Sequence, residues 1–246
     1  IQKEENYING VKNGNFIEYY YNKRASKFYY YTNNLIDSIY YEYLPNGEYS
    51  VKGEFNLGLK TGIWETYRED GSIYSIGNFE NDFQSGNWKF FHRSGYVSSE
   101  GNFNNGYESG QWIYYFESGE LDEIGSFMSG LREGLWGRFH KNGNLKQEET
   151  YKLGRLIYVS DYYSIDGDKI DIGSFKNGNG ELLDYYENGS IFTKSTYKNG
   201  YLNGIFNEFH PNGKVSQRGS YKNNLKVGLW VEYNRRGLET SRIKYD

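Results

Sequence analysis

The chain has 246 residues, of which 20% are aromatic, 31 are glycine and only two are proline. Its 28 basic and 32 acidic residues give a formal net charge of −4 without any basic block, which argues against a nucleic-acid partner. The lack of cysteine excludes disulfides and thiolate metal sites, and no apolar run reaches the 18 or more residues of a membrane-spanning helix.

A repeat of about 24 residues runs along the chain and predicts its organisation. Residues 1–4 are expected to be an N-terminal tail, and residues 5–246 a single array that ends in a closing strand at 243–246. The spacing breaks once, with a step of 22 residues between Gly173 and Ser195. The predicted units start near residues 5, 29, 53, 77, 101, 125, 149, 173, 195 and 219.

Aromatic residues recur at fixed positions when each unit is numbered from its start, with two residues missing after Lys176. Positions 3 and 15 are aromatic in every unit, and position 12 is aromatic in eight of the ten. All five tryptophans of the chain occupy position 12: Trp64, Trp88, Trp112, Trp136 and Trp230. Such columns are typical of strands that stack their side chains from one unit to the next.

Turn-forming residues recur as regularly as the aromatic ones. Position 6 is Gly, Asn or Asp throughout, and position 19 is Gly in nine units, as in Asn46-Gly47 and Asp70-Gly71. Asn-Gly and Asp-Gly pairs between strand-like segments indicate hairpins. Each unit should then hold two strands, at positions 21 to 3 and 11 to 16, joined by a tight turn at 18–19 and a longer turn at 5–10.

A single hairpin is at best marginally stable in water, so neighbouring units must pair edge to edge. Cross-strand aromatic pairs, which contribute roughly 0.2–1 kcal/mol each, can then replace a closed core. The sequence therefore predicts an all-β fold: an elongated, single-layer antiparallel β-meander built from tandem 24-residue β-hairpin repeats.

The units share a motif of the form G-x-F-x-x-G-x-x-x-G-x-W-x-x-Y-x-x-x-G, which runs from Gly101 through Trp112 to Gly119. This motif resembles the MORN repeat, and more closely its bacterial variant type, over about ten tandem units. The resemblance implies a single-layer β-meander that contacts a protein or a membrane surface, often as a dimer. Because the chain begins at Ile1, we also expect a processed protein, with a secreted or cell-envelope location favoured over a cytoplasmic one.

No residue pattern predicts an enzyme, a metal site or a cofactor site. His92, His140 and His210 all occupy position 16 and are separated by two and three units, too far apart to share a metal ion. The acidic residues around the Asp166-Gly167 turn lack the ordered spacing of a calcium loop. We therefore expect a non-catalytic protein in which the histidines have structural or surface roles.

Partner binding is predicted at two places. The first is the tryptophan column, chiefly Trp64, Trp88, Trp112 and Trp136, although a role as the scaffold's own ladder is favoured over a ligand platform. The second is the irregular stretch 149–195, where a bend or gap is favoured over a partner-specific notch. The residues singled out in that stretch are Tyr158, Asp161 and Tyr162.

These features together predict a repeat scaffold that binds another macromolecule along an extended aromatic-rich surface. A protein partner is favoured, and the alternative is a cell-surface carbohydrate-binding array. A membrane-surface role would need a basic face and is less favoured, whereas a homodimer stays open.

Overall fold

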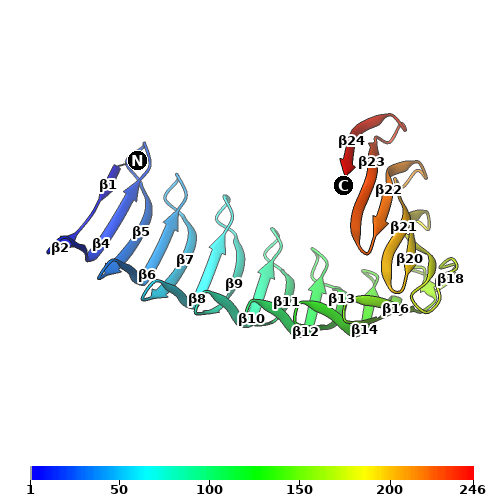
Figure 1. Cartoon of the computed structure of the whole chain (residues 1–246), viewed down its shortest axis with the longest axis horizontal. Helices are drawn as coiled ribbons and strands as arrows, with labels where there is room; N and C mark the ends of the chain where they lie inside the picture. Colours follow the sequence, from blue (N-terminus) through cyan, green and yellow to red (C-terminus); the bar gives the residue numbers. More distant parts are fainter. Residues whose placement is uncertain (1) are drawn as a thin grey trace. The chain divides into compact units, whose positions relative to one another are not determined.

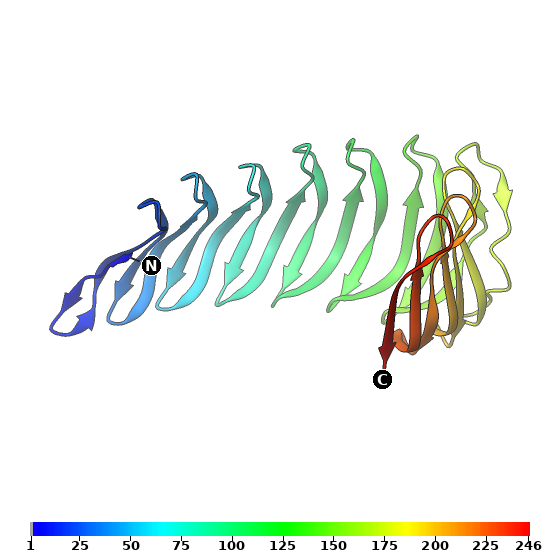
Figure 2. The ribbon, with the colours of Figure 1, turned by 90° about the horizontal axis from the view of Figure 1, so that it is seen from above.

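A computed structural model describes residues 2–246, and within this range it contains strands and turns but no helix, so none that could span a membrane. The chain divides into two compact parts (Figures 1 and 2). The N-terminal part comprises the residues up to Leu121 together with Phe127–Gly130, and the C-terminal part comprises Asp122–Ser126 and Leu131–Asp246. The predicted all-β antiparallel meander is confirmed.

Fourteen strands form one antiparallel sheet in the order β1, then β4 to β16, and β2 pairs with β3 beside it. Residues 2–4, which the repeat count left outside the array, form β1 and pair with β4. The strands up to β12 are β1 (Gln2–Glu4), β2 (Tyr7–Ile8), β3 (Val11–Lys12), β4 (Gly14–Tyr19), β5 (Ala25–Thr32), β6 (Leu35–Tyr43), β7 (Tyr49–Asn56), β8 (Leu59–Tyr67), β9 (Ile73–Glu80), β10 (Phe83–Phe91), β11 (Val97–Asn104) and β12 (Tyr107–Tyr115).

The remaining strands complete this sheet and build a second one of six strands, β19 to β24, while β17 pairs with β18. These strands are β13 (Leu121–Met128), β14 (Leu131–Phe139), β15 (Leu145–Lys152), β16 (Arg155–Val159), β17 (Tyr162–Tyr163), β18 (Lys169–Ile170), β19 (Gly180–Tyr185), β20 (Ile191–Lys198), β21 (Tyr201–Phe209), β22 (Val215–Lys222), β23 (Leu225–Tyr233) and β24 (Glu239–Tyr245).

Both turns of each unit are short. The tight turn at positions 18–19 is confirmed: the amide of Arg68 donates to the carbonyl of Ser72, and the amide of Gly71 to that of Arg68. The longer turn expected at positions 5–10 is wrong. Positions 5 and 6 have positive φ in all ten units, as in Leu57 (48°) and Gly58 (91°). A two-residue type I′ turn requires positive φ at both of its central residues.

The second strand of a regular unit therefore begins at position 7 and not at position 11. The glycine at position 10 does not end a turn, because it lies in a β-bulge within the strand. In β10 the pairing with β9 shifts between Ser85 and Trp88, so that Gly86, with a φ of 64°, and Asn87 are extra residues. An insertion of two residues preserves the alternation of faces along the strand.

Alternation places positions 3, 8, 12 and 14 on one face of the sheet, which we call the tryptophan face. Pairing agrees with this, since Phe55 lies opposite Lys60 and Trp64 lies opposite Gly77. Positions 7, 11 and 15 lie on the opposite face. Aromatic residues therefore occupy both faces, as the odd spacing between positions 12 and 15 predicts.

The tryptophans are buried although the N-terminal part has only one layer of strands. Trp64, Trp88 and Trp112 of this part are 3%, 4% and 3% exposed, and Trp136 of the C-terminal part is 0% exposed. Each ring lies flat over the glycine at position 1 of its own unit: a Cβ added to Gly101 would be 2.3 Å from Cδ2 of Trp112. All five units with tryptophan have glycine at position 1. Of the five units without tryptophan, only that of Gly173 has glycine there, and the other four have Glu5, Tyr29, Glu149 and Ser195.

The irregular stretch marks a break between the two sheets. β16 is the last strand of the first sheet and β19 the first strand of the second, and no regular strand covers residues 171–179. A small core lies beside the break and consists of Leu156, Val159, Phe175 and Leu182. The structure thus shows a gap in the ladder here.

Candidate binding surface

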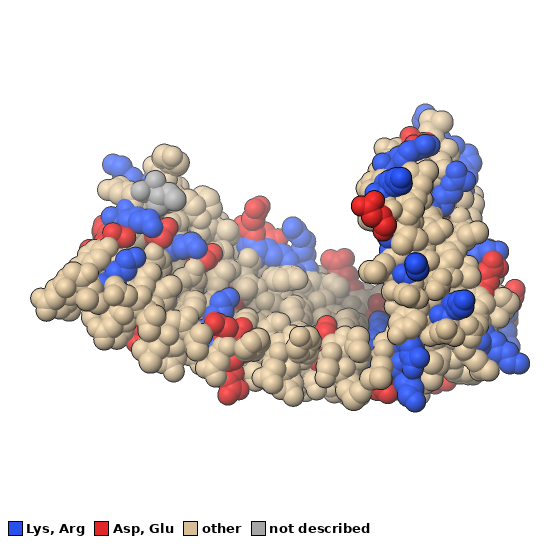
Figure 3. Space-filling view, in the orientation of Figure 1, with Lys and Arg blue, Asp and Glu red and all other residues tan. Residues whose placement is uncertain are grey.

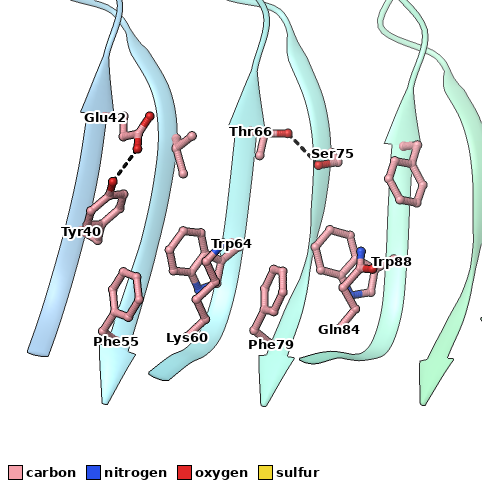
Figure 4. A pocket seen from close by; sticks show the side chains of 12 residues that line it. Tyr40, Glu42, Phe55, Lys60, Trp64, Thr66, Ser75, Phe79, Gln84 and Trp88 are labelled. Atoms are coloured by element: carbon pink, nitrogen blue, oxygen red, sulfur yellow. Dashed lines mark hydrogen bonds between the residues drawn. The ribbon is translucent and has the colours of Figure 1, made fainter. Parts of the chain in front are cut away.

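The tryptophan face of the N-terminal part carries a hollow of about 340 Å³, here called the aromatic groove (Figure 4). Every lining side chain comes from strands β6 to β10. The rings that line it are Tyr40, Phe55, Trp64, Phe79, Trp88 and Phe90, and the polar lining residues include Glu42, Lys60, Thr66, Ser75 and Gln84.

Phenylalanines at position 3 stand edge-on between the flat tryptophan rings. Phe55 and Trp64 have ring centroids 5.2 Å apart at 84°, and Phe79 and Trp88 lie 5.3 Å apart, also at 84°. The indole N–H groups are already used, since that of Trp64 donates to the carbonyl of Thr61 at 3.1 Å. Because the floor offers no free donor, a ligand would meet an apolar surface with phenylalanine walls.

Polar groups lie at both rims of the aromatic groove. At one rim, Lys60 Nζ lies 4.3 Å from the centroid of the Trp64 ring, a cation–π distance. At the other rim, Glu42 accepts hydrogen bonds from Lys27 at 2.8 Å and from the Tyr40 hydroxyl. Burial alone would raise the pKa of Glu42, but these two hydrogen bonds hold the pKa below its ordinary value, so the carboxylate stays charged.

The three histidines connect neighbouring units. Nε2 of His92 lies 2.8 Å from the carbonyl oxygen of Tyr115, and His140 and His210 make the same contact with Tyr163 and Tyr233 at 2.8 and 2.9 Å. Because a carbonyl oxygen only accepts, Nε2 carries the proton in each pair. Within residues 2–246, no group of three or more histidine, aspartate and glutamate side chains is placed to hold a metal ion.

The substitution His92→Leu tests this connection. Leucine already occupies the equivalent position 16 in another unit, at Leu44. We expect the free energy of unfolding to fall by about 1 kcal/mol, because the carbonyl of Tyr115 loses its donor. Urea unfolding of the full chain measures the change. An unaltered midpoint would contradict the assigned role.

The residues predicted for partner binding have different environments. The four tryptophans are buried, so a partner would reach the side chains around them and not their ring faces. Tyr158 is 54% exposed, and Asp161 is exposed and pairs with Lys169 at 2.6 Å. Tyr162 is only 1% exposed, and its hydroxyl donates to the carbonyl of Tyr185 at 3.1 Å. Partner binding at these positions stays a prediction.

An exposed apolar column at position 7, on the opposite face, was not predicted from the sequence. In the sequence, this column can be recognised by an apolar residue that directly follows the turn residue at position 6. It was not predicted because positions 7 to 10 were assigned to the turn. Members that are 43–71% exposed are Leu35, Leu59, Phe83, Tyr107, Leu131 and Leu225. This column is a second candidate contact surface.

A charged cluster holds the strands of the C-terminal part together. Arg138 lies 3.3 Å from Glu149 and 2.9 Å from Asp184, and thereby links β14 and β15 of the first sheet with β19 of the second. Arg132 pairs with Glu123 through two contacts of 2.7 and 2.8 Å. The side chains of Glu123 and Glu149 are only 16% and 9% exposed, and burial raises the pKa of Glu123 although the hydrogen bonds from Arg132 act to lower it.

Charges are interspersed elsewhere on the surface. On the face shown in Figure 3, lysines and arginines do not gather into one block on the N-terminal part, and acidic side chains lie among them. This distribution agrees with the absence of a basic block in the sequence.

Comparison with known proteins gives matches to a repeat model and to solved structures. No curated protein matches the chain. Among solved structures, the Photorhabdus luminescens Tc holotoxin pore matches with a TM-score of 0.17 and 12% identity, over 96% of this chain and 15% of that one. A TcdB2-TccC3 crystal structure matches with a TM-score of 0.18 and 11% identity, over 94% and 13%.

The chain thus spans less than a sixth of those larger chains, and superpositions at such scores do not establish a shared fold. The repeat itself gives a clearer result. Four segments match the family model described as the MORN repeat variant, namely residues 60–81, 132–153, 178–199 and 202–223.

Proposed function

We propose that this protein is a non-catalytic scaffold of about ten MORN-type repeats that binds another protein along its tryptophan face. MORN repeats are in general binding repeats, and four segments of the chain match their variant form. The observation that carries the proposal is the aromatic groove: an open, largely apolar hollow held on rigid strands. Exposed apolar hollows with a few fixed polar groups are typical of recognition surfaces.

A protein partner fits this groove better than a carbohydrate does. Sugars stack on the open face of an aromatic ring, but Trp64 and Trp88 expose only 3% and 4% of their surface. What the groove presents instead is phenylalanine edges beside Lys60 and Gln84. Apolar side chains and a peptide backbone complement such a surface more fully than a ring of hydroxyl groups.

Substitutions that introduce a residue already present at the equivalent position of another unit can test the proposal while preserving the fold. Phe90→Thr removes a ring from the groove, and threonine already occupies the equivalent position 14 at Thr66. The matched control is Ile63→Asn on the opposite face, where Asn87 holds the equivalent position 11. We expect a partner isolated with the native protein to bind the Phe90→Thr variant at least about tenfold more weakly, a loss of about 1.4 kcal/mol.

The control variant should bind this partner with unchanged affinity. The reverse pattern, with loss only in Ile63→Asn, would transfer the binding surface to the opposite face. Binding to a glycan panel without any protein partner would favour the carbohydrate alternative and overturn the proposal.

A further inference from the structure

We propose that the aromatic groove takes an extended, proline-rich segment that carries an acidic residue and runs across the strands. This inference rests on the proposed function and names the kind of partner segment that the groove fits. It rests on one geometric argument, the spacing expected between units, and on two observations, the shape of the phenylalanine walls and the charge at one rim of the groove.

The spacing of the units selects a polyproline II conformation. Strands lie about 4.8 Å apart and each unit has two of them, so equivalent side chains recur about every 9.6 Å across the sheet. A polyproline II helix has three residues per turn and rises about 3.1 Å per residue, which gives about 9.3 Å per turn. Every third residue of such a segment therefore meets the same position of each successive unit.

Other peptide conformations do not keep this step. An extended β-strand repeats its side-chain direction about every 6.8 Å, and an α-helix turns about every 5.4 Å. Over three units, the repeat of a polyproline II segment differs from the spacing of the units by a total of only about 1 Å. For a β-strand or an α-helix the accumulated difference is several ångströms. The repeat of the scaffold thus matches one backbone conformation of the ligand.

The walls of the groove suit proline rings. Phe55 and Phe79 stand edge-on and alternate with the flat rings of Trp64 and Trp88, at centroid distances between 5.2 and 5.7 Å. A flat, apolar pyrrolidine ring can lie between two such edges. Because proline has no N–H and the indole N–H groups are already used, this contact leaves no donor unpaired.

Charge at the groove selects an acidic residue in the segment. Glu42 is neutralised by Lys27, at 2.8 Å. Lys60 has no carboxylate within ion-pair distance among residues 2–246, and its ammonium lies 4.3 and 5.0 Å from the rings of Trp64 and Phe79. One unit further on, Gln84 offers amide donors, and the next unit has Glu108 in the same column. An acidic side chain of the segment is therefore favoured where it lies next to Lys60 and disfavoured two turns further on, where it would lie next to Glu108. This difference fixes the register of the segment along the groove.

A fluorescently labelled peptide of twelve residues tests the inference against the full chain. It contains four Pro-Pro-x turns, with one Glu and three Gln at x, and spans about 37 Å, or about four units. The first control peptide has the same composition in shuffled order, and the second has Lys in place of Glu. Anisotropy titrations at low salt should show at least tenfold weaker binding for both controls.

Two protein variants localise the binding. Lys60→Gln should weaken binding of the Glu peptide at least threefold and leave a peptide with Gln at every x unaffected. Lys23→Gln, at an exposed turn of the same part, should change neither. Equal binding of the periodic and shuffled peptides would overturn the inference, and so would an unchanged affinity for Lys60→Gln.

The outcomes separate this inference from the proposed function. If the natural partner loses affinity for the Phe90→Thr variant while the periodic peptide does not bind, the groove is a protein-binding surface but the occupant is of another kind. If the partner is insensitive to Phe90→Thr as well, both proposals fail.

Discussion

Gly101→Ala should lower the free energy of unfolding by about 3 kcal/mol, the upper end of the cost of overpacking. The backbone of Gly101 does not have the positive φ that would itself disfavour alanine. The cost arises because the new Cβ would lie 2.3 Å from Cδ2 of Trp112, so the indole must leave its place over the glycine. Chemical denaturation followed by tryptophan fluorescence measures the loss.

The same substitution should cost much less when Trp112 is replaced by phenylalanine. In the unit that starts at Ser195, position 12 is Phe206, and a serine side chain is accommodated at position 1. We therefore expect a coupling energy above about 1 kcal/mol between the two substitutions in a double-mutant cycle. Equal costs of Gly101→Ala in both backgrounds would contradict the ring-on-glycine packing. Ser195→Ala is the control and should have a small effect.

Arg138→Met should destabilise the C-terminal part by about 2–3 kcal/mol, somewhat less than the removal of one partner from a fully buried ion pair. The side chains of Glu149 and Asp184 are only 9% and 20% exposed, and both lose their closest cation. Arg132 and Lys146, each 3.8 Å from one of these carboxylates, compensate for part of the loss.

The control for Arg138→Met is Arg242→Met, which removes an exposed pair with Glu239 and should leave the unfolding midpoint unchanged. Adding Glu149→Gln and Asp184→Asn to Arg138→Met should recover part of the lost stability, because neither side chain then carries a negative charge that has lost its closest cation. The recovery is only partial because Lys146 loses its pair with Asp184. If Arg138→Met alone has no effect on unfolding, the cluster does not hold the strands together.

The repeat period predicted most of the fold because each column of residues has a physical requirement. Aromatic positions 3 and 12 and the residues of both turns lie where the pattern places them. The error at positions 7 to 10 came from reading Gly62 as the end of a turn. This residue instead has a φ of 66° within strand β8, a conformation that glycine adopts readily inside a bulge.

The candidate surface was only partly predictable. The sequence identified the tryptophan column, but burial of Trp64 depends on its glycine, on Phe55 and on Lys60, and these contacts require the strand register. The ion pair between Arg138 and Asp184 joins residues 46 positions apart across the break between the sheets. No periodicity could predict that pair, because it forms where the repeat is interrupted.

The most direct test of the binding surface compares two phenylalanines of the same strand, β10. Phe90 lines the aromatic groove, whereas Phe83 lies on the opposite face and is 56% exposed. A photo-reactive phenylalanine analogue placed at each position in turn should cross-link the natural partner from position 90 and not from position 83. Cross-linking from position 83 alone would show that the partner binds the other side of the sheet.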